Sequence, residues 1–122
     1  MPPVERMQHW LKQFGLQSYS SYPMGAISQG TAKRVALAST LLHEPDILLL
    51  DEPTNGLDPD QVIMVRDTLQ MYCAKGALIL LSTHIIGLAE KIAHQAAILR
   101  KGRIVYAGKA TEDLESLYVS HT

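Results

Sequence analysis

Two short apolar runs constrain the fold of this chain more than any other feature. Residues 47–50 read Ile-Leu-Leu-Leu and residues 77–81 read Ala-Leu-Ile-Leu-Leu, with a helical pattern between them. A continuous apolar run of this length, bounded by turn residues, is typical of a strand that is buried on both faces of a sheet. Apolar strands that alternate with helices predict an α/β fold with a mainly parallel sheet.

Two helices are expected before the first strand. The first is predicted by four apolar residues at helical spacing, which are Val4, Met7, Leu11 and Phe14. Gly15 is expected to end this helix. After a loop over residues 17–26, Ser28 is expected to cap a second helix that runs to about His43. Its apolar stripe would consist of Ala32, Val35, Ala36 (or Ser39) and Leu42.

A third helix is expected between the two strands. Asp58 would be its N-cap, with Pro59 at the first helical position, Gln61 as a capping-box partner and Gly76 as the C-cap. Its buried face would consist of Val62, Val65, Leu69 and Tyr72.

The last third of the chain predicts a short helix, a hairpin and a final helix. The short helix covers residues 85–93, and the hairpin pairs residues 96–100 with residues 103–106 across Lys101-Gly102. Thr111 would cap the final helix, with Glu112 and Asp113 in its first turn.

Composition excludes several classes of protein. With 122 residues, a net charge of −1 and 47% hydrophobic residues, one globular unit is expected, and nucleic acid is not expected as the main ligand. The single cysteine excludes an internal disulfide, and no apolar run has the length of a membrane span. The first residues lack the apolar segment of a secretory signal, so we expect an intracellular location.

The first apolar run ends in two adjacent acids, Asp51 and Glu52, followed by a Pro/Asn/Gly turn. Carboxylates at the end of a buried strand are costly unless they serve a cation or a reaction. In nucleotide hydrolases one such acid holds Mg²⁺ while its neighbour orients the attacking water. Taken alone, such a pair is more often an ordinary strand end whose acids cap a turn.

Two further segments could bind phosphate. Ser28, Gln29 and Gly30 stand at a predicted helix start, where exposed N–H groups favour an anion, although a simple serine cap is commoner. His84 ends the second apolar run as Glu52 ends the first, and its imidazole could hydrogen-bond a phosphoryl group or be merely structural.

Together these segments resemble the ATP-binding-cassette (ABC) ATPase family, over residues 4–117. Residues 27–31, Ile-Ser-Gln-Gly-Thr, resemble its signature motif, and residues 47–52 resemble its Walker B strand with the catalytic glutamate. Residues 55–58, Asn-Gly-Leu-Asp, resemble its D-loop as found in bacterial exporter-type cassettes, and His84 resembles its switch histidine. The order and the spacing of these motifs agree with the family throughout.

The resemblance implies a role for each matching residue. Asp51 would hold Mg²⁺, Glu52 would act as general base or orient the attacking water, and His84 would contact the γ-phosphate of the same ATP. Ser28, Gln29 and Gly30 would bind the ATP of an opposite cassette, and Asp58 would couple the two sites. Two residues depart from the family signature, which usually has glycine at the position of Gln29 and glutamine at that of Thr31.

The phosphate-binding loop of the family, G-x-x-x-x-G-K-[ST], occurs nowhere in the chain. The resemblance therefore implies the C-terminal half of a cassette, with part of a helical subdomain at residues 1–45 and part of a RecA-like P-loop NTPase core at residues 46–122. The family sheet would lack the strand beside residues 77–81, which leaves an apolar edge. We expect no ATP hydrolysis by the chain alone, because the missing loop supplies most of the phosphate binding.

The resemblance also implies partners and a location. We expect a missing N-terminal half or a second cassette, a transmembrane permease subunit, and a place in the cytoplasm or on the cytoplasmic face of the membrane. Two other interpretations remain open: a non-catalytic interaction module that completes the site of another cassette, and a truncated, decayed cassette without activity.

Overall fold

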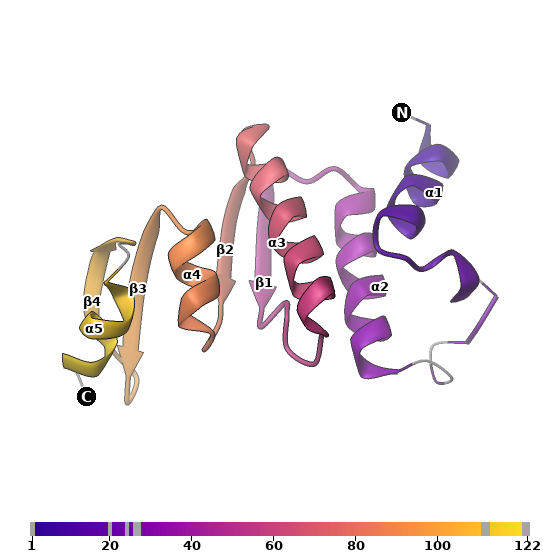
Figure 1. Ribbon diagram of the computed structural model, residues 1–122. Coiled ribbons are helices and arrows are strands. Elements are labelled where there is room, and N and C mark those ends of the chain that lie inside the picture. The colour runs from indigo at the N-terminus through magenta and orange to yellow at the C-terminus, as the bar shows by residue number, and fades with distance from the viewer. Residues whose placement is uncertain (1, 20, 24, 26–27, 111–112, 121–122) are drawn as a thin grey trace. The chain divides into compact units, whose positions relative to one another are not determined.

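The computed structural model describes residues 2–19, 21–23, 25, 28–110 and 113–120. The elements divide between two compact units, Met1–Ser82 and Thr83–Thr122 (Figure 1). The first unit contains α1 (Pro3–Gln13), η1 (Gln17–Tyr19), α2 (Gln29–Leu42), β1 (Ile47–Asp51), α3 (Pro59–Ala74) and β2 (Leu78–Ser82). The second unit contains α4 (Ile86–Ile92), β3 (Gln95–Arg100), β4 (Arg103–Lys109) and α5 (Leu114–Ser120).

The sheet of the first unit consists of β1 and β2, which pair in parallel, as the sequence predicts. The register runs from Ile47 opposite Leu78 to Asp51 opposite Ser82. Because parallel strands need a crossover, α3 connects them and contacts β2. Leu48 of β1 and Leu69 of α3 are almost completely buried. The unit is therefore a βαβ arrangement in which both strands end at the same edge.

The prediction that both strands are buried on both faces is wrong for this chain. Ile47 and Leu49 of β1 and Leu78 and Leu80 of β2 are exposed, while Leu48 between them is buried. Successive side chains of a strand point to opposite faces. The exposure therefore alternates because, among the described residues, only one face of this sheet is covered.

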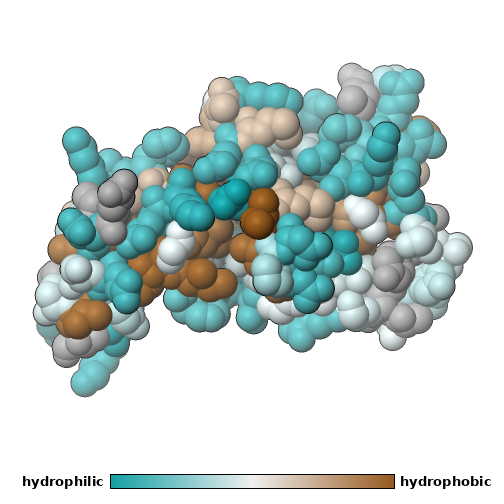
Figure 2. All heavy atoms as spheres, in the orientation of Figure 1, coloured by the Kyte–Doolittle hydropathy of each residue, from teal (hydrophilic) through white to brown (hydrophobic). Residues whose placement is uncertain are grey.

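The start of α3 agrees with the prediction. Asp58 is the N-cap with Pro59 behind it, and the N–H of Asp58 donates to Oε1 of Gln61 at 3.2 Å. Of the predicted buried face, Val65 and Leu69 are buried, and Thr68 completes it. In the space-filling view, hydrophilic residues are mixed with apolar ones over this helix (Figure 2).

Helix α1 forms where predicted, but its buried face is different. Val4 and Met7 are exposed, whereas Trp10 and Phe14 are buried and their rings stack with centroids 5.7 Å apart. Trp10 lies on the face next to the predicted stripe. Because a tryptophan ring offers more apolar area than valine or methionine, the helix turns that face toward the core.

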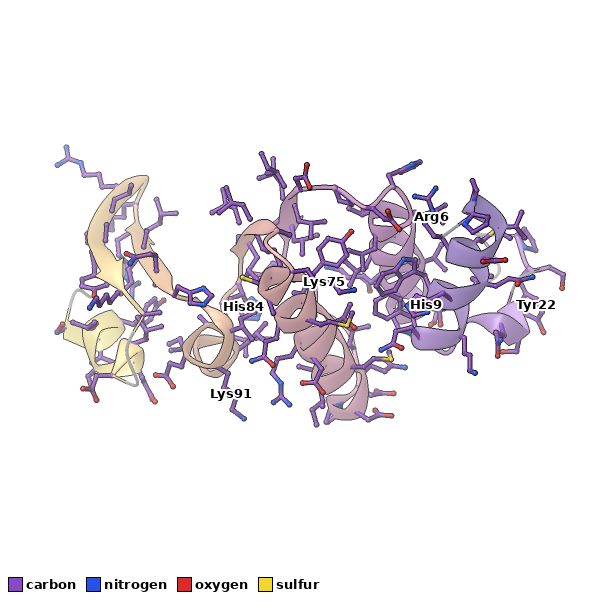
Figure 3. The ribbon with its side chains drawn as sticks, turned by 90° about the horizontal axis from the view of Figure 1, so that it is seen from above. Arg6, His9, Tyr22, Lys75, His84 and Lys91 are labelled. Atoms are coloured by element: carbon purple, nitrogen blue, oxygen red, sulfur yellow. The ribbon has the colours of Figure 1, made fainter. Side chains whose placement is uncertain are left out.

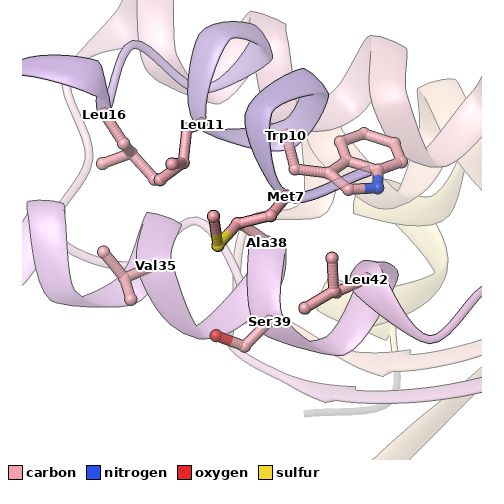
Figure 4. Close-up of a pocket in the computed structure, with 8 residues that line it drawn as sticks. All are labelled: Met7, Trp10, Leu11, Leu16, Val35, Ala38, Ser39 and Leu42. Atoms are coloured by element: carbon pink, nitrogen blue, oxygen red, sulfur yellow. The ribbon is translucent and has the colours of Figure 1, made fainter. Parts of the chain in front are cut away.

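Helix α2 is capped by Ser28 as predicted, but the predicted apolar stripe is wrong. The buried residues lie on a neighbouring face: Thr31, Arg34, Leu37, Ala38 and Leu41. Part of the predicted stripe instead lines a cavity of about 70 Å³ between α1 and α2 (Figure 4). Met7, Trp10 and Leu11 of α1 face Val35, Ser39 and Leu42 of α2 there.

The second unit contains the predicted hairpin. β3 and β4 pair antiparallel, and Lys101 and Gly102 in the turn both have positive φ, 48° and 77°. Two such residues are the requirement of a tight hairpin turn, which glycine meets without strain. A final helix, α5, is present as expected, while Thr111 and Glu112 lie outside the described residues.

Candidate functional site

Asp51 is the last residue of β1, and its carboxylate is held by the neighbouring strand. Asp51 lies opposite Ser82 in the ladder, and the Ser82 hydroxyl donates a hydrogen bond to Oδ1 of Asp51 at 2.5 Å. Both residues are exposed at the carboxyl ends of their strands. In open α/β sheets this edge is where ligands bind.

Glu52 follows directly, with its backbone fixed from two directions. Its N–H donates to the carbonyl of Ser82 at 2.9 Å, while its carbonyl accepts from the N–H of Asn55 at 3.2 Å and from Nζ of Lys33 on α2. Its φ is 46°, in the left-handed region that L-residues rarely adopt. Strained backbone of this kind concentrates at functional positions.

The segment after Glu52 turns sharply into α3. Gly56 has φ +81°, and the N–H of Leu57 donates to the carbonyl of Thr54 at 3.2 Å. Thr54 is buried, and its hydroxyl has no hydrogen-bond partner among the described residues. Thr54 is not among the residues to which the sequence motifs point. Its only signal is a hydroxyl within a Pro/Asn/Gly turn, a position that is usually exposed.

The start of α2 forms a chain of hydrogen bonds into the interior. The Ser28 hydroxyl accepts from the N–H of Thr31 at 3.2 Å and donates to Oγ1 of Thr31 at 2.9 Å. The same Oγ1 accepts from buried Arg34, which also donates to the carbonyl of Phe14 at 2.6 Å. In the sequence, Thr31 stands out only because it departs from the usual glutamine of the signature motif. It orients the Ser28 hydroxyl at the first turn.

The helix start and the turn after β1 touch each other. A Cβ added to Gly30 would lie 3.0 Å from the carbonyl oxygen of Gly56. The absence of a side chain at Gly30 therefore permits this close approach. Through this contact and the Lys33 bond, the structure brings Gly30 and its helix start beside the segment that follows Asp51 and Glu52.

The remaining predicted residues occupy three different places. Gln29 is the exposed first residue of α2, and Asp58 is the exposed N-cap of α3. His84 belongs to the second unit, where it is exposed on the segment before α4 (Figure 3). Ile27, the first residue of the signature-like motif, lies outside the described residues.

The oxygen atoms at the strand ends suit a magnesium ion. The Asp51 carboxylate and the Ser82 hydroxyl stand side by side, and both are exposed to solvent. Mg²⁺ in proteins is held by one or two such oxygens and takes its other ligands from water and phosphate. Among the described residues, no group of three His, Cys, Asp or Glu side chains could hold a metal by itself.

Comparisons with known proteins agree with one another. Residues 3–55 match the protein family described as ABC transporter. The ATP-binding protein NatA of an ABC transporter from Bacillus subtilis (strain 168) is 35% identical over 115 residues, which are 94% of this chain and 45% of that protein. Nod factor export ATP-binding protein I of Burkholderia pseudomallei (strain 1710b) is 38% identical over 76% of this chain and 31% of that protein.

Solved structures give the same result. An ATP-binding subunit of an ABC transporter superposes with a TM-score of 0.88 and 32% identity, over 98% of this chain and 54% of the other. The cbiO1 protein from Clostridium perfringens, part of the ABC transporter complex cbiONQ, superposes with a TM-score of 0.70 and 32% identity. The match covers 98% of this chain and 49% of the other.

The chain thus spans about half, or less, of the length of these relatives. Within the described ranges, no helix combines the length and the apolar character that crossing a membrane requires.

Proposed function

The chain belongs to the ABC transporter ATPase family, and we propose that it acts as the C-terminal part of an ATP-binding subunit that powers transport. One observation carries this proposal. The acids Asp51 and Glu52 end a parallel strand, and the start of α2 touches the turn that follows them. Hydrolysis of ATP depends on such positioning and charge more than on covalent chemistry.

The acids take different roles in this proposal. Asp51, steadied by Ser82, holds Mg²⁺, which neutralises charge on the phosphates of ATP when it is bound. Glu52 accepts the proton of the attacking water or orients that water, and its left-handed backbone sets the direction of its side chain. His84 donates a hydrogen bond to the γ-phosphate, where negative charge accumulates.

The start of α2 serves a second nucleotide. Ser28, Gln29 and Gly30 present an exposed helix N-terminus, and the family pattern assigns them to the ATP that is held by an opposite cassette. Asp58, at the start of α3, links the two sites across that dimer. We propose that residues 1–45 form part of the helical subdomain and that residues 46–122 form part of the RecA-like core.

The proposed partners supply what this chain does not contain. The loop that cradles the β- and γ-phosphates would come from an N-terminal half or from a complete cassette. A permease would place the assembly on the cytoplasmic face of a membrane. The cbiO1 protein, a part of such a transporter complex, supports a permease partner.

The test is co-production with the N-terminal half of an ABC ATP-binding subunit, followed by an ATPase assay. We expect Mg²⁺-dependent turnover by the pair, loss of turnover in Glu52→Gln, and no turnover by the chain alone. Glu115→Gln, an exposed acid on α5, is the matched control and should leave turnover unchanged. Turnover by the chain alone that Glu52→Gln abolishes would contradict the need for a second half.

A second candidate function is a non-catalytic interaction module. It is favoured by the ordered and exposed start of α2, where Ser28 and Gln29 could complete the nucleotide site of an intact cassette. Mixing the chain with an intact cassette discriminates between the two functions. Only the module predicts a change in the ATPase rate of that cassette without any added N-terminal half.

A further inference from the structure

Lys33 joins helix α2 to the turn that carries Glu52. It lies in the second turn of α2 and is half-buried, and its Nζ donates a hydrogen bond to the backbone carbonyl of Glu52. A hydrogen bond with a charged donor is roughly twice as strong as one between neutral groups. Lys33 therefore holds this carbonyl more firmly than a neutral side chain would.

The bonded carbonyl belongs to strained backbone. Glu52 has a φ of 46°, a conformation that an L-residue keeps only where the surrounding structure enforces it. Its N–H donates to the carbonyl of Ser82 at 2.9 Å, and its carbonyl also accepts from the N–H of Asn55 at 3.2 Å. Both of these bonds join backbone to backbone. The bond from Lys33 adds a side chain to this set, so the geometry of Glu52 depends on which residue stands at position 33.

Helix α2 gives Lys33 a fixed support. The next residue, Arg34, is buried and donates to the carbonyl of Phe14 at 2.6 Å, which ties α2 to the end of α1. On the other side of Lys33, Gly30 lies against the carbonyl oxygen of Gly56. Because these neighbours hold the helix, the ammonium group of Lys33 reaches the Glu52 turn from a backbone that is itself anchored.

We propose that Lys33 is a positioning residue for Glu52: by holding the backbone carbonyl, it sets the direction in which the Glu52 carboxylate points. This inference rests on the function proposed above, in which Glu52 orients or deprotonates the attacking water. A misplacement of about 1 Å in such a step costs roughly 100-fold in rate. Lys33 is not itself a catalytic residue, because its ammonium group is engaged by the carbonyl.

The alternative is that Lys33 only fastens α2 to the end of β1. Its loss would then loosen the whole unit, and every slowly exchanging amide of the unit would open more often. In the positioning role the effect is confined to the backbone around Glu52. Amide hydrogen exchange separates the two roles because it reports on each residue by itself.

The first test is amide exchange in the full chain, followed by NMR without ATP. Lys33→Met has a side chain of similar length without charge or donors. We expect exchange at the N–H groups of Glu52 and Asn55 to become faster by at least about tenfold, and exchange at buried Val65 of α3 to stay within about twofold. The matched control is Lys75→Met at the exposed C-terminal end of α3, which should change neither.

The second test uses the ATPase of the chain co-produced with an N-terminal half. Lys33→Met should lower kcat by about 10- to 100-fold, because the carboxylate of Glu52 is misdirected. The KM for ATP should stay within about twofold, since Lys33 makes no bond to the nucleotide in this proposal. Lys33→Arg keeps a cationic donor and should restore kcat to within about threefold of the unmodified value. Lys75→Met should leave both constants unchanged.

Folding of the variants is checked by circular dichroism, and Lys33→Gln replaces Lys33→Met if that variant unfolds. Unchanged exchange at Glu52 overturns the proposal, and so does equal acceleration at Glu52 and Val65. A kcat that Lys33→Met leaves intact, or that Lys33→Arg does not restore, overturns it as well. If the unmodified pair shows no turnover while Lys33→Met accelerates exchange only around Glu52, the proposed function is contradicted and the fixing of the Glu52 backbone by Lys33 is supported.

Discussion

The hydroxyl of Ser82 donates a hydrogen bond to the carboxylate of Asp51, across the last register pair of β1 and β2. The proposed magnesium ligand therefore owes its orientation to the neighbouring strand. In the proposed function, a cation that arrives with ATP would meet a carboxylate that is already positioned, so that less conformational entropy would be lost on binding.

Ser82→Ala should change the magnesium requirement without unfolding the chain. The pair is exposed, so the free energy of unfolding should stay within about 0.5 kcal/mol of the unmodified value. In the complemented ATPase, half-maximal turnover should need several-fold more Mg²⁺. Ser120→Ala, whose hydroxyl donates to the carbonyl of Leu117 in α5, should leave that requirement unchanged. An unchanged Mg²⁺ requirement in Ser82→Ala would refute this role.

Gly30→Ala should separate the start of α2 from the turn after β1. The new Cβ would meet the Gly56 carbonyl at 3.0 Å, and backbone on both sides leaves little room to adjust. We expect a loss of about 1–3 kcal/mol in the free energy of unfolding, measured in urea. Gly87→Ala in α4, whose Cβ would meet nothing within 4 Å, should be neutral or stabilising.

Thr31→Val should uncouple Ser28 from the interior. The substitution keeps the shape but removes the oxygen that bonds both Ser28 and buried Arg34. Because a buried polar group then loses a partner, a loss of about 1–3 kcal/mol is expected in urea unfolding. Thr40→Val removes an exposed hydroxyl from the same helix and should cost less than about 0.5 kcal/mol. Equal losses of unfolding free energy in Thr31→Val and Thr40→Val would contradict a stabilising role for the hydrogen bonds that join Thr31 to Ser28 and Arg34.

Glu52→Gly should remove the proposed base and raise stability or leave it unchanged. The φ of 46° costs an L-residue about 1 kcal/mol, a strain that glycine does not feel. The control is Ala36→Gly within α2, where glycine should lower the free energy of unfolding by about 1 kcal/mol. A clear loss of stability in Glu52→Gly would show that the side chain contributes more than the strain costs.

Tyr72 should ionise at a higher pH than an ordinary tyrosine. Burial raises its pKa above 10.0, and the nearby carboxylates of Glu44 and Asp46 raise it further. Because the folded state favours the neutral phenol, its stabilising contribution is complete below the ordinary pKa and is lost as the pH rises through the raised one. The absorbance of tyrosinate is followed as the pH rises, and the curve of Tyr72→Phe is subtracted to isolate Tyr72. The midpoint of the remaining curve should move to lower pH in Glu44→Gln. If the midpoint does not move in Glu44→Gln, the Glu44 carboxylate does not contribute to the raised pKa of Tyr72.

Local patterns predicted the elements well, because caps and turn residues act within a few positions. Ser28, Asp58 and the Lys101-Gly102 turn all lie where the sequence places them. Which face each helix buries depends instead on distant partners. Apolar spacing alone could not decide between the stripe of Val35 and the neighbouring stripe that contains Arg34.

In the candidate site, too, local features could be predicted and tertiary contacts could not. The acids at the end of β1 could be predicted because a strand end fixes them, and Ser28 because a helix start does. The contacts that join them could not, since Lys33 reaches Glu52 and Gly30 reaches Gly56 only through the tertiary fold. The exposure of Leu49 and Leu80 was also unforeseen, because sequence cannot tell whether a strand has one covered face or two.

The parallel ladder also determines when this protein can fold. Asp51 gains its partner only after α3 and β2 have been synthesised, because Ser82 is the last residue of that unit. Until then the nascent chain carries an unpaired apolar strand through the crowded exit from the ribosome. Closure over this long sequence separation is slow. Chaperones that bind extended apolar segments should therefore raise the yield of the folded protein.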